Sequence, residues 1–111
     1  MLDFYLLEDD ALRPSPARLA ELPKAGQLSA DDFTDLQNQR IIEKRLDHWQ
    51  DFRWSNGIVN MKLQLLLHRY PQLTPATPLA DTPEQRLFLL LLNASAANTG
   101  LLAIGHDDHS T

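Results

Sequence analysis

Short apolar runs mark the two ends of this 111-residue chain, and longer helix-like stretches fill the middle. The first run, LDFYLL at 2–7, combines aliphatic and aromatic residues and stops at an acidic cluster, which favours a strand over a helix. The second run, LLAI at 101–104, lies between two glycines and is also typical of a strand. These two segments could pair with each other as a small two-stranded arrangement.

A helix is predicted over about 30–39 because its start is well marked. Ser29 can cap it, and Asp32 stands at the third position of a capping box, although glutamate or glutamine is more usual there. Phe33 and Leu36 form only a thin inward stripe, so we expect a short helix.

The strongest start signal in the chain is TPEQ at 82–85, with a cap, a first-turn proline and a glutamine at the capping-box position. It predicts a helix to about Asn98, with Gly100 as a left-handed stop. Residues 87–92, LFLLLL, are apolar on every side. This helix therefore lies either at the centre of the core or half buried against a second subunit.

Other local signals are weaker. SNG at 55–57 is a turn or cap signal, and apolar positions at helical spacing predict a helix at 58–69. A serine–proline pair before 17–22 predicts one or two helical turns there. The proline-rich segment 71–83 is expected to be a stiff irregular connection.

The stretch LDHWQDFRWS concentrates both tryptophans, two aspartates, a histidine and an arginine in ten positions. In a helix over 41–54, at about 100° per residue, Trp49 and Arg53 share one stripe with aliphatic side chains. Asp47 and Asp51, four residues apart, share the opposite side and face water.

Together these elements predict a mainly α fold. Three to four helices surround a central apolar helix at about 82–98, and the N- and C-terminal segments could add the two-stranded pairing. Segments 30–39 and 41–54 form either one helix or two. We expect a single domain over 1–111, with a flexible tail at 105–111.

Fifteen acidic against ten basic side chains give a net charge of −5, which disfavours nucleic-acid binding. The absence of cysteine excludes disulfides, thiolate metal sites and a cysteine nucleophile. The N-terminus lacks the basic start of a signal peptide, and no apolar run reaches the roughly 20 residues of a membrane span. A cytoplasmic protein without a membrane segment, bound metal or cofactor is expected.

Arg53 is the unusual residue of the aromatic stripe. It is either paired inside the fold with an indole and a carboxylate, or available to an anionic group of a partner. Trp54 either covers the edge of the core or is exposed as a binding anchor. The candidate binding residues are therefore Trp49, Arg53 and Trp54, with Asp47 and Asp51 as a charged rim.

The same stretch permits an alternative, a small enzyme or ligand-binding protein whose pocket is lined by Asp47, His48, Asp51 and Arg53. Two aspartates alone lack the environment that separates their pKa values for acid–base work. No nucleophile elbow or glycine-rich phosphate loop is present, so no catalytic residue is assigned. HDDH at 106–109 contains metal-ligand types but is interpreted as a disordered polar tail.

The segments MLDFYL, SADDFTDLQNQRII, LDHWQDFRW and GLLAIGHD, in this order, resemble a group of small uncharacterised bacterial proteins over most of the chain. The resemblance implies a bacterial cytosolic protein and brings no activity or site residue with it. Small acidic bacterial proteins of this sort include immunity proteins that cap a toxin. The sequence thus favours a protein-interaction module that is either immunity-like or homodimeric.

Overall fold

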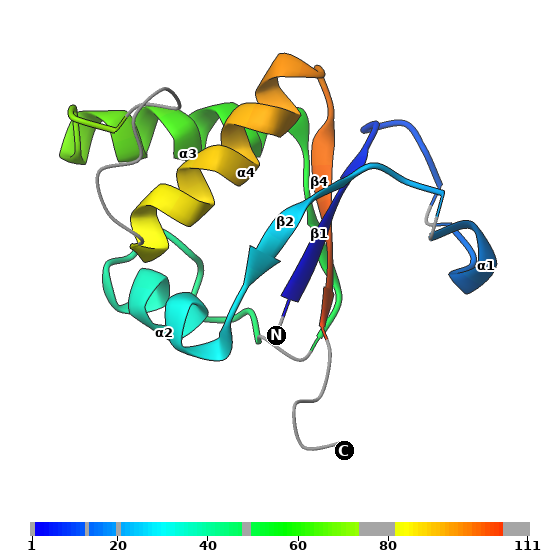
Figure 1. Ribbon diagram of the computed structural model, residues 1–111, viewed down its shortest axis with the longest axis horizontal. Helices are drawn as coiled ribbons and strands as arrows, with labels where there is room; N and C mark the ends of the chain where they lie inside the picture. Colours follow the sequence, from blue (N-terminus) through cyan, green and yellow to red (C-terminus); the bar gives the residue numbers. More distant parts are fainter. Residues whose placement is uncertain (1, 13, 20, 48–49, 74–81, 106–111) are drawn as a thin grey trace.

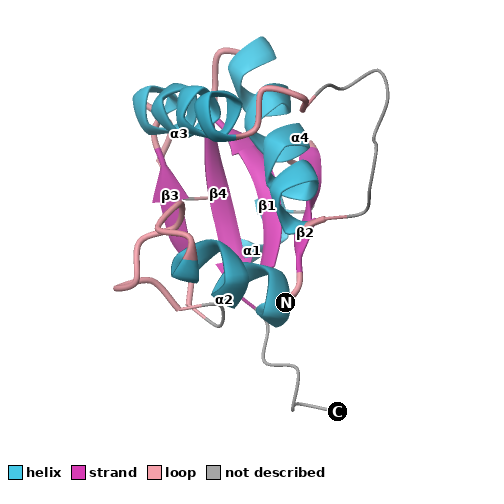
Figure 2. Cartoon of the chain, turned by 90° about the vertical axis from the view of Figure 1, so that its left-hand side faces the viewer, coloured by secondary structure: helices cyan, strands magenta, loops and turns pink. Residues whose placement is uncertain are grey.

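One antiparallel sheet of four strands forms the centre of the computed structural model of the chain. The structure describes residues 2–12, 14–19, 21–47, 50–73 and 82–105. The strands lie in the order β2-β1-β4-β3 and are β1 (Leu2–Leu7), β2 (Lys24–Leu28), β3 (Phe52–Trp54) and β4 (Gly100–Gly105). The helices are α1 (Pro16–Leu19), α2 (Ala30–Asn38), α3 (Asn56–Arg69) and α4 (Pro83–Ala96). Helices α2, α3 and α4 cover one face of the sheet, and the short α1 lies on the opposite side (Figures 1 and 2).

The prediction of a mainly α fold is wrong, because a four-stranded sheet carries the helical layer. The pairing of the two terminal apolar segments is confirmed: β1 and β4 run antiparallel, from Leu2 opposite Gly105 to Leu7 opposite Gly100. They are the two central strands, and each pairs with a further strand on its other side. These two edge strands have weak sequence signals, because β2 reads KAGQL without a β-branched residue and β3 has three residues.

The predicted helix over 41–54 is also wrong. Helix α2 ends at Asn38, the described residues from 41 to 51 are irregular, and Phe52–Trp54 pairs with β4 as a strand. Neither alternative for one helix or two therefore holds. In the strand, Phe52 and Trp54 pack toward the core while Arg53 is exposed, a period of two that replaces the expected helical stripe.

The predicted starts of α2 and α4 are confirmed, and α3 begins at Asn56, two residues before the start predicted at Ile58. The hydroxyl groups of Ser29, Ser55 and Thr82 each accept a hydrogen bond from the main-chain N–H three residues later, at the starts of α2, α3 and α4. The carboxylate of Asp32 accepts from the Ser29 main-chain N–H and completes the capping box of α2.

Helices α2 and α4 end in the same left-handed turn. The residue after the cap has a positive φ, +63° at Arg40 and +56° at Asn98. In both turns the following N–H donates to the carbonyl five residues back, Ile41 to Leu36 at 3.0 Å and Thr99 to Ala94 at 2.9 Å. Gly100, predicted as the stop of the last helix, is instead the first residue of β4. Asparagine also tolerates the left-handed region, so the helix ends two residues earlier than expected.

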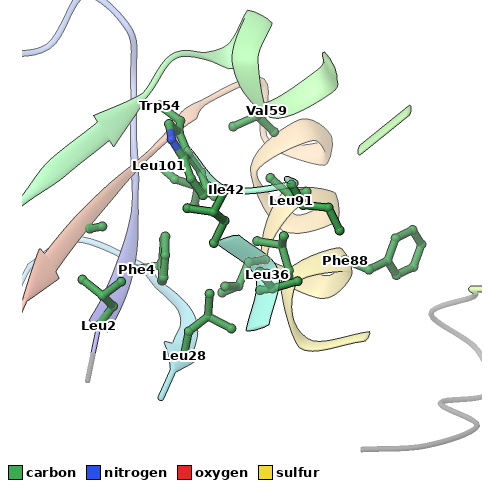
Figure 3. Close-up of a cluster of buried hydrophobic side chains, with 14 of the residues drawn as sticks. Leu2, Phe4, Leu28, Leu36, Ile42, Trp54, Val59, Phe88, Leu91 and Leu101 are labelled. Atoms are coloured by element: carbon green, nitrogen blue, oxygen red, sulfur yellow. The ribbon is translucent and has the colours of Figure 1, made fainter. Parts of the chain in front are cut away.

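The core lies between the sheet and the helical layer (Figure 3). Phe4, Phe52 and Trp54 form an aromatic group on the sheet, with ring centroids 5.2 to 6.1 Å apart. Helix α4 packs closely on β2 at Gly26, where a Cβ would lie 2.6 Å from Cδ2 of Leu90. This close approach helps to fix the helical layer on the edge strand.

Helix α4 is not the centre of a helical bundle, as the sequence predicted for the 82–98 segment, but is one of three helices packed on one face of the sheet (Figure 2). Its buried side chains are Gln85, Leu87, Phe88, Leu90, Leu91 and Ala94. Leu89 remains 36 % exposed on the outer side of the helix. Across the described ranges, no helix is long and apolar enough to cross a membrane.

An ion pair joins α2 to α4. Arg86 donates from Nε and Nη2 to the two carboxylate oxygens of Asp32, at 2.7 and 2.6 Å. This bidentate contact holds the pKa of the buried Asp32 carboxyl below its usual range, although burial alone would raise that pKa.

Candidate functional site

The guanidinium of Arg53 is bound to the main chain of the loop that follows β1. Nη1 donates to the carbonyl of Ala11 at 2.8 Å, and Nη2 donates to the carbonyls of Glu8 at 2.8 Å and Asp9 at 3.4 Å. Arg53 is thus paired within the fold, but not in the way that the first alternative described. Its described partners are main-chain oxygens rather than an indole and a carboxylate.

Asp9 attaches the same loop to the start of α3, because its Oδ1 accepts the main-chain N–H of Asn56 at 2.8 Å. Gly100 lies against this junction. A Cβ at Gly100 would lie 2.2 Å from the main-chain oxygen of Trp54 and 3.0 Å from Oδ1 of Asp9, so this approach requires glycine. The loop 8–11 is thus fixed by contacts with β3, α3 and β4.

Beside this loop, eight described residues between Leu7 and Leu22 line an open cleft of about 650 Å³. Its lining residues come from the end of β1, the loop after it, α1 and the residues just after α1. Helix α1 lies on the side of the sheet opposite α2, α3 and α4 (Figure 1). The lining of the cleft is mostly apolar and consists of Leu7, Ala11, Leu12, Pro14, Ser15, Arg18, Glu21 and Leu22. Leu12 is 90 % exposed, the most of any large hydrophobic side chain that the structure describes.

Acidic side chains border the cleft. Glu8, Asp9 and Asp10 are consecutive and exposed on the loop that Arg53 holds, and exposed Glu21 belongs to the lining. Among the described lining residues, Arg18 is the one cation. The described border has these four acidic side chains against Arg18 and the guanidinium of Arg53, so it is acidic overall and favours the approach of positively charged groups.

The sequence-predicted binding residues do not form one surface. Trp54 is 3 % exposed and covers the core, which leaves it almost no area for a partner. Asp51 is exposed and its Oδ1 accepts the main-chain N–H of Gly105 at 3.0 Å, while Asp47 is half-buried in the irregular segment. Trp49 lies outside the described residues.

The residues proposed for the alternative pocket are only partly described, and those that are described make separate contacts. Neither the cleft at 7–22 nor a smaller cleft at 40–44 is lined by Asp47, Asp51 or Arg53, and His48 lies outside the described residues. Arg53 reaches the loop after β1, whereas Asp51 contacts the end of β4. Within the described ranges, no group of three or more His, Asp or Glu side chains could hold a metal ion.

Sequence reasoning missed the acidic loop and the exposed leucine beside it. Glu8–Asp10 was interpreted only as the end of a strand, and Leu12 belonged to no predicted element. The sequence did contain a signal for this surface. Three consecutive acidic residues precede an isolated leucine in a proline-containing loop, and no predicted helix or strand would bury that leucine.

Sequence reasoning also missed a buried lysine. Lys62 is 4 % exposed, and its Nζ donates to Oε1 of Glu43 at 2.6 Å and to the carbonyl of Ile41 at 2.8 Å. The same ammonium lies 4.9 Å from the ring centroid of Trp54. Its position between Val59 and Leu66 on the buried side of α3 was the available signal.

Glu43 is the acidic member of this cluster. Burial is the largest single influence on its carboxyl and acts to raise the pKa. The hydrogen bond and charge of Lys62, together with a main-chain hydrogen bond and the nearby indole of Trp54, outweigh burial, so the pKa is lowered. The indole Nε1 of Trp54 also lies close enough to favour the ionised form, although the two groups do not meet in full hydrogen-bond geometry. The cluster therefore consists of an ionised carboxylate and a lysine that attach the segment after α2 to α3.

Comparison with protein-family models, with curated proteins and with solved structures gives no match to this chain.

Proposed function

We propose that this chain is a protein-interaction module that binds a basic protein partner through the acidic loop 8–11 and the neighbouring cleft. The observation that carries the proposal is the attachment of Arg53 to the carbonyls of Glu8, Asp9 and Ala11. The attached loop presents exposed carboxylates beside an apolar cleft, a combination that suits a charged segment with one apolar anchor.

The expected occupant is a segment with lysine or arginine residues and an aliphatic or aromatic side chain. The apolar side chain would enter the cleft next to Leu12, whose exposure is otherwise unfavourable in water. The basic residues would face Glu8, Asp10 and Glu21. The net charge of −5 adds long-range attraction for such a partner and accelerates encounter at low salt.

A fixed loop also lowers the entropic cost of binding. The carbonyls of Glu8 and Ala11 are held by the guanidinium, and the side chain of Asp9 is held by Asn56. Because the loop is already ordered, less conformational freedom is lost when a partner binds. Arg53 acts in this proposal as a positioning residue rather than as a direct contact.

Charge favours a different protein over a second copy of this chain as the partner. Two copies that met at this surface would bring their acidic loops together, and like charges at an interface oppose association. An immunity-like role, in which the chain covers a basic toxin in the bacterial cytoplasm, is the form of the proposal that this argument supports.

A peptide titration followed by amide NMR shifts tests the proposal. The probe is a short peptide of alternating lysine and leucine, compared with a peptide in which glutamate replaces lysine. We expect shifts for the lysine peptide that concentrate at residues 7–22 and weaken as salt is raised from about 50 mM to about 500 mM. The variant Glu8→Gln/Asp10→Asn should bind about fivefold more weakly.

The matched control is Asp31→Asn/Asp35→Asn, which removes the same charge from the exposed side of α2. It should retain nearly all of the affinity, because these carboxylates are on a different element. If the two double variants lost affinity equally, or if the shifts were spread evenly over the molecule, only the net charge would matter. Either result would contradict the proposal.

A further inference from the structure

A second cleft, of about 350 Å³, lies at the end of α2 and is independent of the acidic loop. Its lining consists of Arg40, Ile42, Glu43 and Lys44. Its volume is near the lower end of the range for small-molecule sites, so a compact ligand fits it better than a large one.

The carboxylate of this cleft is already neutralised. Glu43 pairs with the buried ammonium of Lys62 at 2.6 Å. In the described part of the chain, no hydrogen bond or ion pair engages the guanidinium of Arg40 or the ammonium of Lys44. The lining therefore has two uncompensated positive charges, although the whole chain is acidic.

The cleft is built on a fixed backbone. Gln37 donates from Nε2 to the carbonyls of Glu43 at 3.0 Å and Leu46 at 2.7 Å, and Lys62 holds the carbonyl of Ile41. The two cations are thus carried by a segment whose main chain is attached at several points. Such a segment loses little freedom when a ligand binds.

Arg40 occupies a position where glycine is the usual residue. It follows the cap of α2 with φ +63°, in the left-handed turn that ends the helix. The equivalent position after α4 is Asn98, a residue that tolerates this conformation better. This backbone conformation is unfavourable for an arginine, and its side chain has no described partner. Together these two facts indicate that the guanidinium binds a group from outside this chain.

We propose that this cleft binds a small phosphate-bearing anion between Arg40 and Lys44. A guanidinium can donate two parallel hydrogen bonds to phosphate oxygens, and an ammonium adds a point charge on the other side. The pairing of Glu43 with Lys62 removes the repulsion that a free carboxylate would exert on the anion. No bond is made or broken in this proposal, which concerns binding alone.

The test is an amide NMR titration with inorganic phosphate and with glycerol phosphate, at constant ionic strength against sodium chloride. The shifts should concentrate at residues 40–44. If glycerol phosphate binds more tightly, the ligand is a phosphate monoester, and equal affinities identify free phosphate. Either result supports the site, whereas no saturable shift at 40–44 with either probe overturns it.

The decisive variant is Arg40→Gly, because glycine suits the left-handed turn. We expect affinity for the bound probe to fall by more than about tenfold, while the urea midpoint of unfolding stays equal or rises. Asn98→Gly is the matched control, since it makes the same backbone change after α4 and should leave anion binding unchanged. Retention of binding by Arg40→Gly, or equal shifts at Lys24 and Arg45, would contradict a specific site.

Discussion

Arg53 and Glu8 are 45 residues apart in sequence, and Nη2 of the arginine donates to the main-chain carbonyl of the glutamate at 2.8 Å. This contact joins the edge strand β3 to the loop after β1. Because the acceptor is a main-chain oxygen, the carboxylate of Glu8 stays exposed while its backbone is held.

Replacement of Arg53 by methionine should loosen the loop 8–11. The variant keeps much of the aliphatic stem but loses the hydrogen bonds to Glu8 and Ala11, and we expect about 1 kcal/mol less stability by urea unfolding. Hydrogen exchange at the Ala11 amide should accelerate relative to amides in α4. Arg45→Met, at an exposed position of the segment after α2, is the control. Unchanged protection of Ala11 in Arg53→Met would refute the attachment.

The Asp32–Arg86 pair should make stability depend on pH. The pKa of Asp32 is lowered in the folded chain by the Arg86 hydrogen bonds, so its ionised form stabilises the fold at neutral pH. That stabilisation is lost as the pH falls below about 4 and through the lowered pKa. Glu43, whose pKa is also lowered, contributes in the same direction.

Asp32→Asn should therefore flatten this acid dependence, measured as urea stability at pH values from neutral to acid. The variant begins less stable at neutral pH and loses less on acidification than the unmodified chain. Asp31→Asn changes the same charge at an exposed position of α2 and should leave the profile steep. An identical slope in Asp32→Asn would show that the ion pair does not govern the acid transition.

Lys62→Met should destabilise the chain by about 2 kcal/mol, because Glu43 is left without its cation. The side chain of Glu43 is 33 % exposed, so water limits the loss to less than that of a fully buried pair. The double variant Lys62→Met/Glu43→Gln should recover part of the loss. Additive effects in a double-mutant cycle would disprove the coupling.

Gly100 and Gly57 should respond oppositely to alanine. A Cβ at Gly100 would meet the main-chain oxygen of Trp54 at 2.2 Å, so Gly100→Ala should cost at least about 3 kcal/mol or prevent folding. At Gly57, in the first turn of α3, the nearest atom is Oγ of Ser55 at 3.8 Å. Gly57→Ala should therefore raise the free energy of unfolding by about 0.5 to 1 kcal/mol. Thermal or urea unfolding of both variants measures this difference. Equal effects of the two substitutions on stability would contradict the close approach at Gly100.

Local chemistry in the sequence determined the helix starts and one strand pair. Ser29 and Thr82 cap helices with groups close to them in the chain, so their patterns could be interpreted without knowing the fold. The apolar runs that became β1 and β4 were also visible, because a buried strand needs apolar residues wherever it pairs.

Tertiary structure decided the edge strands and therefore the fold class. KAGQL becomes β2 only because β1 offers a free edge, and FRW becomes β3 only because β4 does the same. Strand pairing depends on residues far apart in sequence, whereas aromatic positions in a short stretch fit a helical stripe and an alternating strand about equally well. The helical interpretation of 41–54 failed for this reason.

For the candidate site residues, too, the sequence determined local requirements and the tertiary structure decided the partners. The sequence showed that Arg53 needed a partner, because a guanidinium among aromatic residues must be hydrogen-bonded or solvated. It could not show that the partners are carbonyls of a loop more than 40 residues earlier, or that Lys62 is buried beside Glu43. Only the folded sheet and α3 bring these groups together, because each contact joins residues that the chain itself keeps apart.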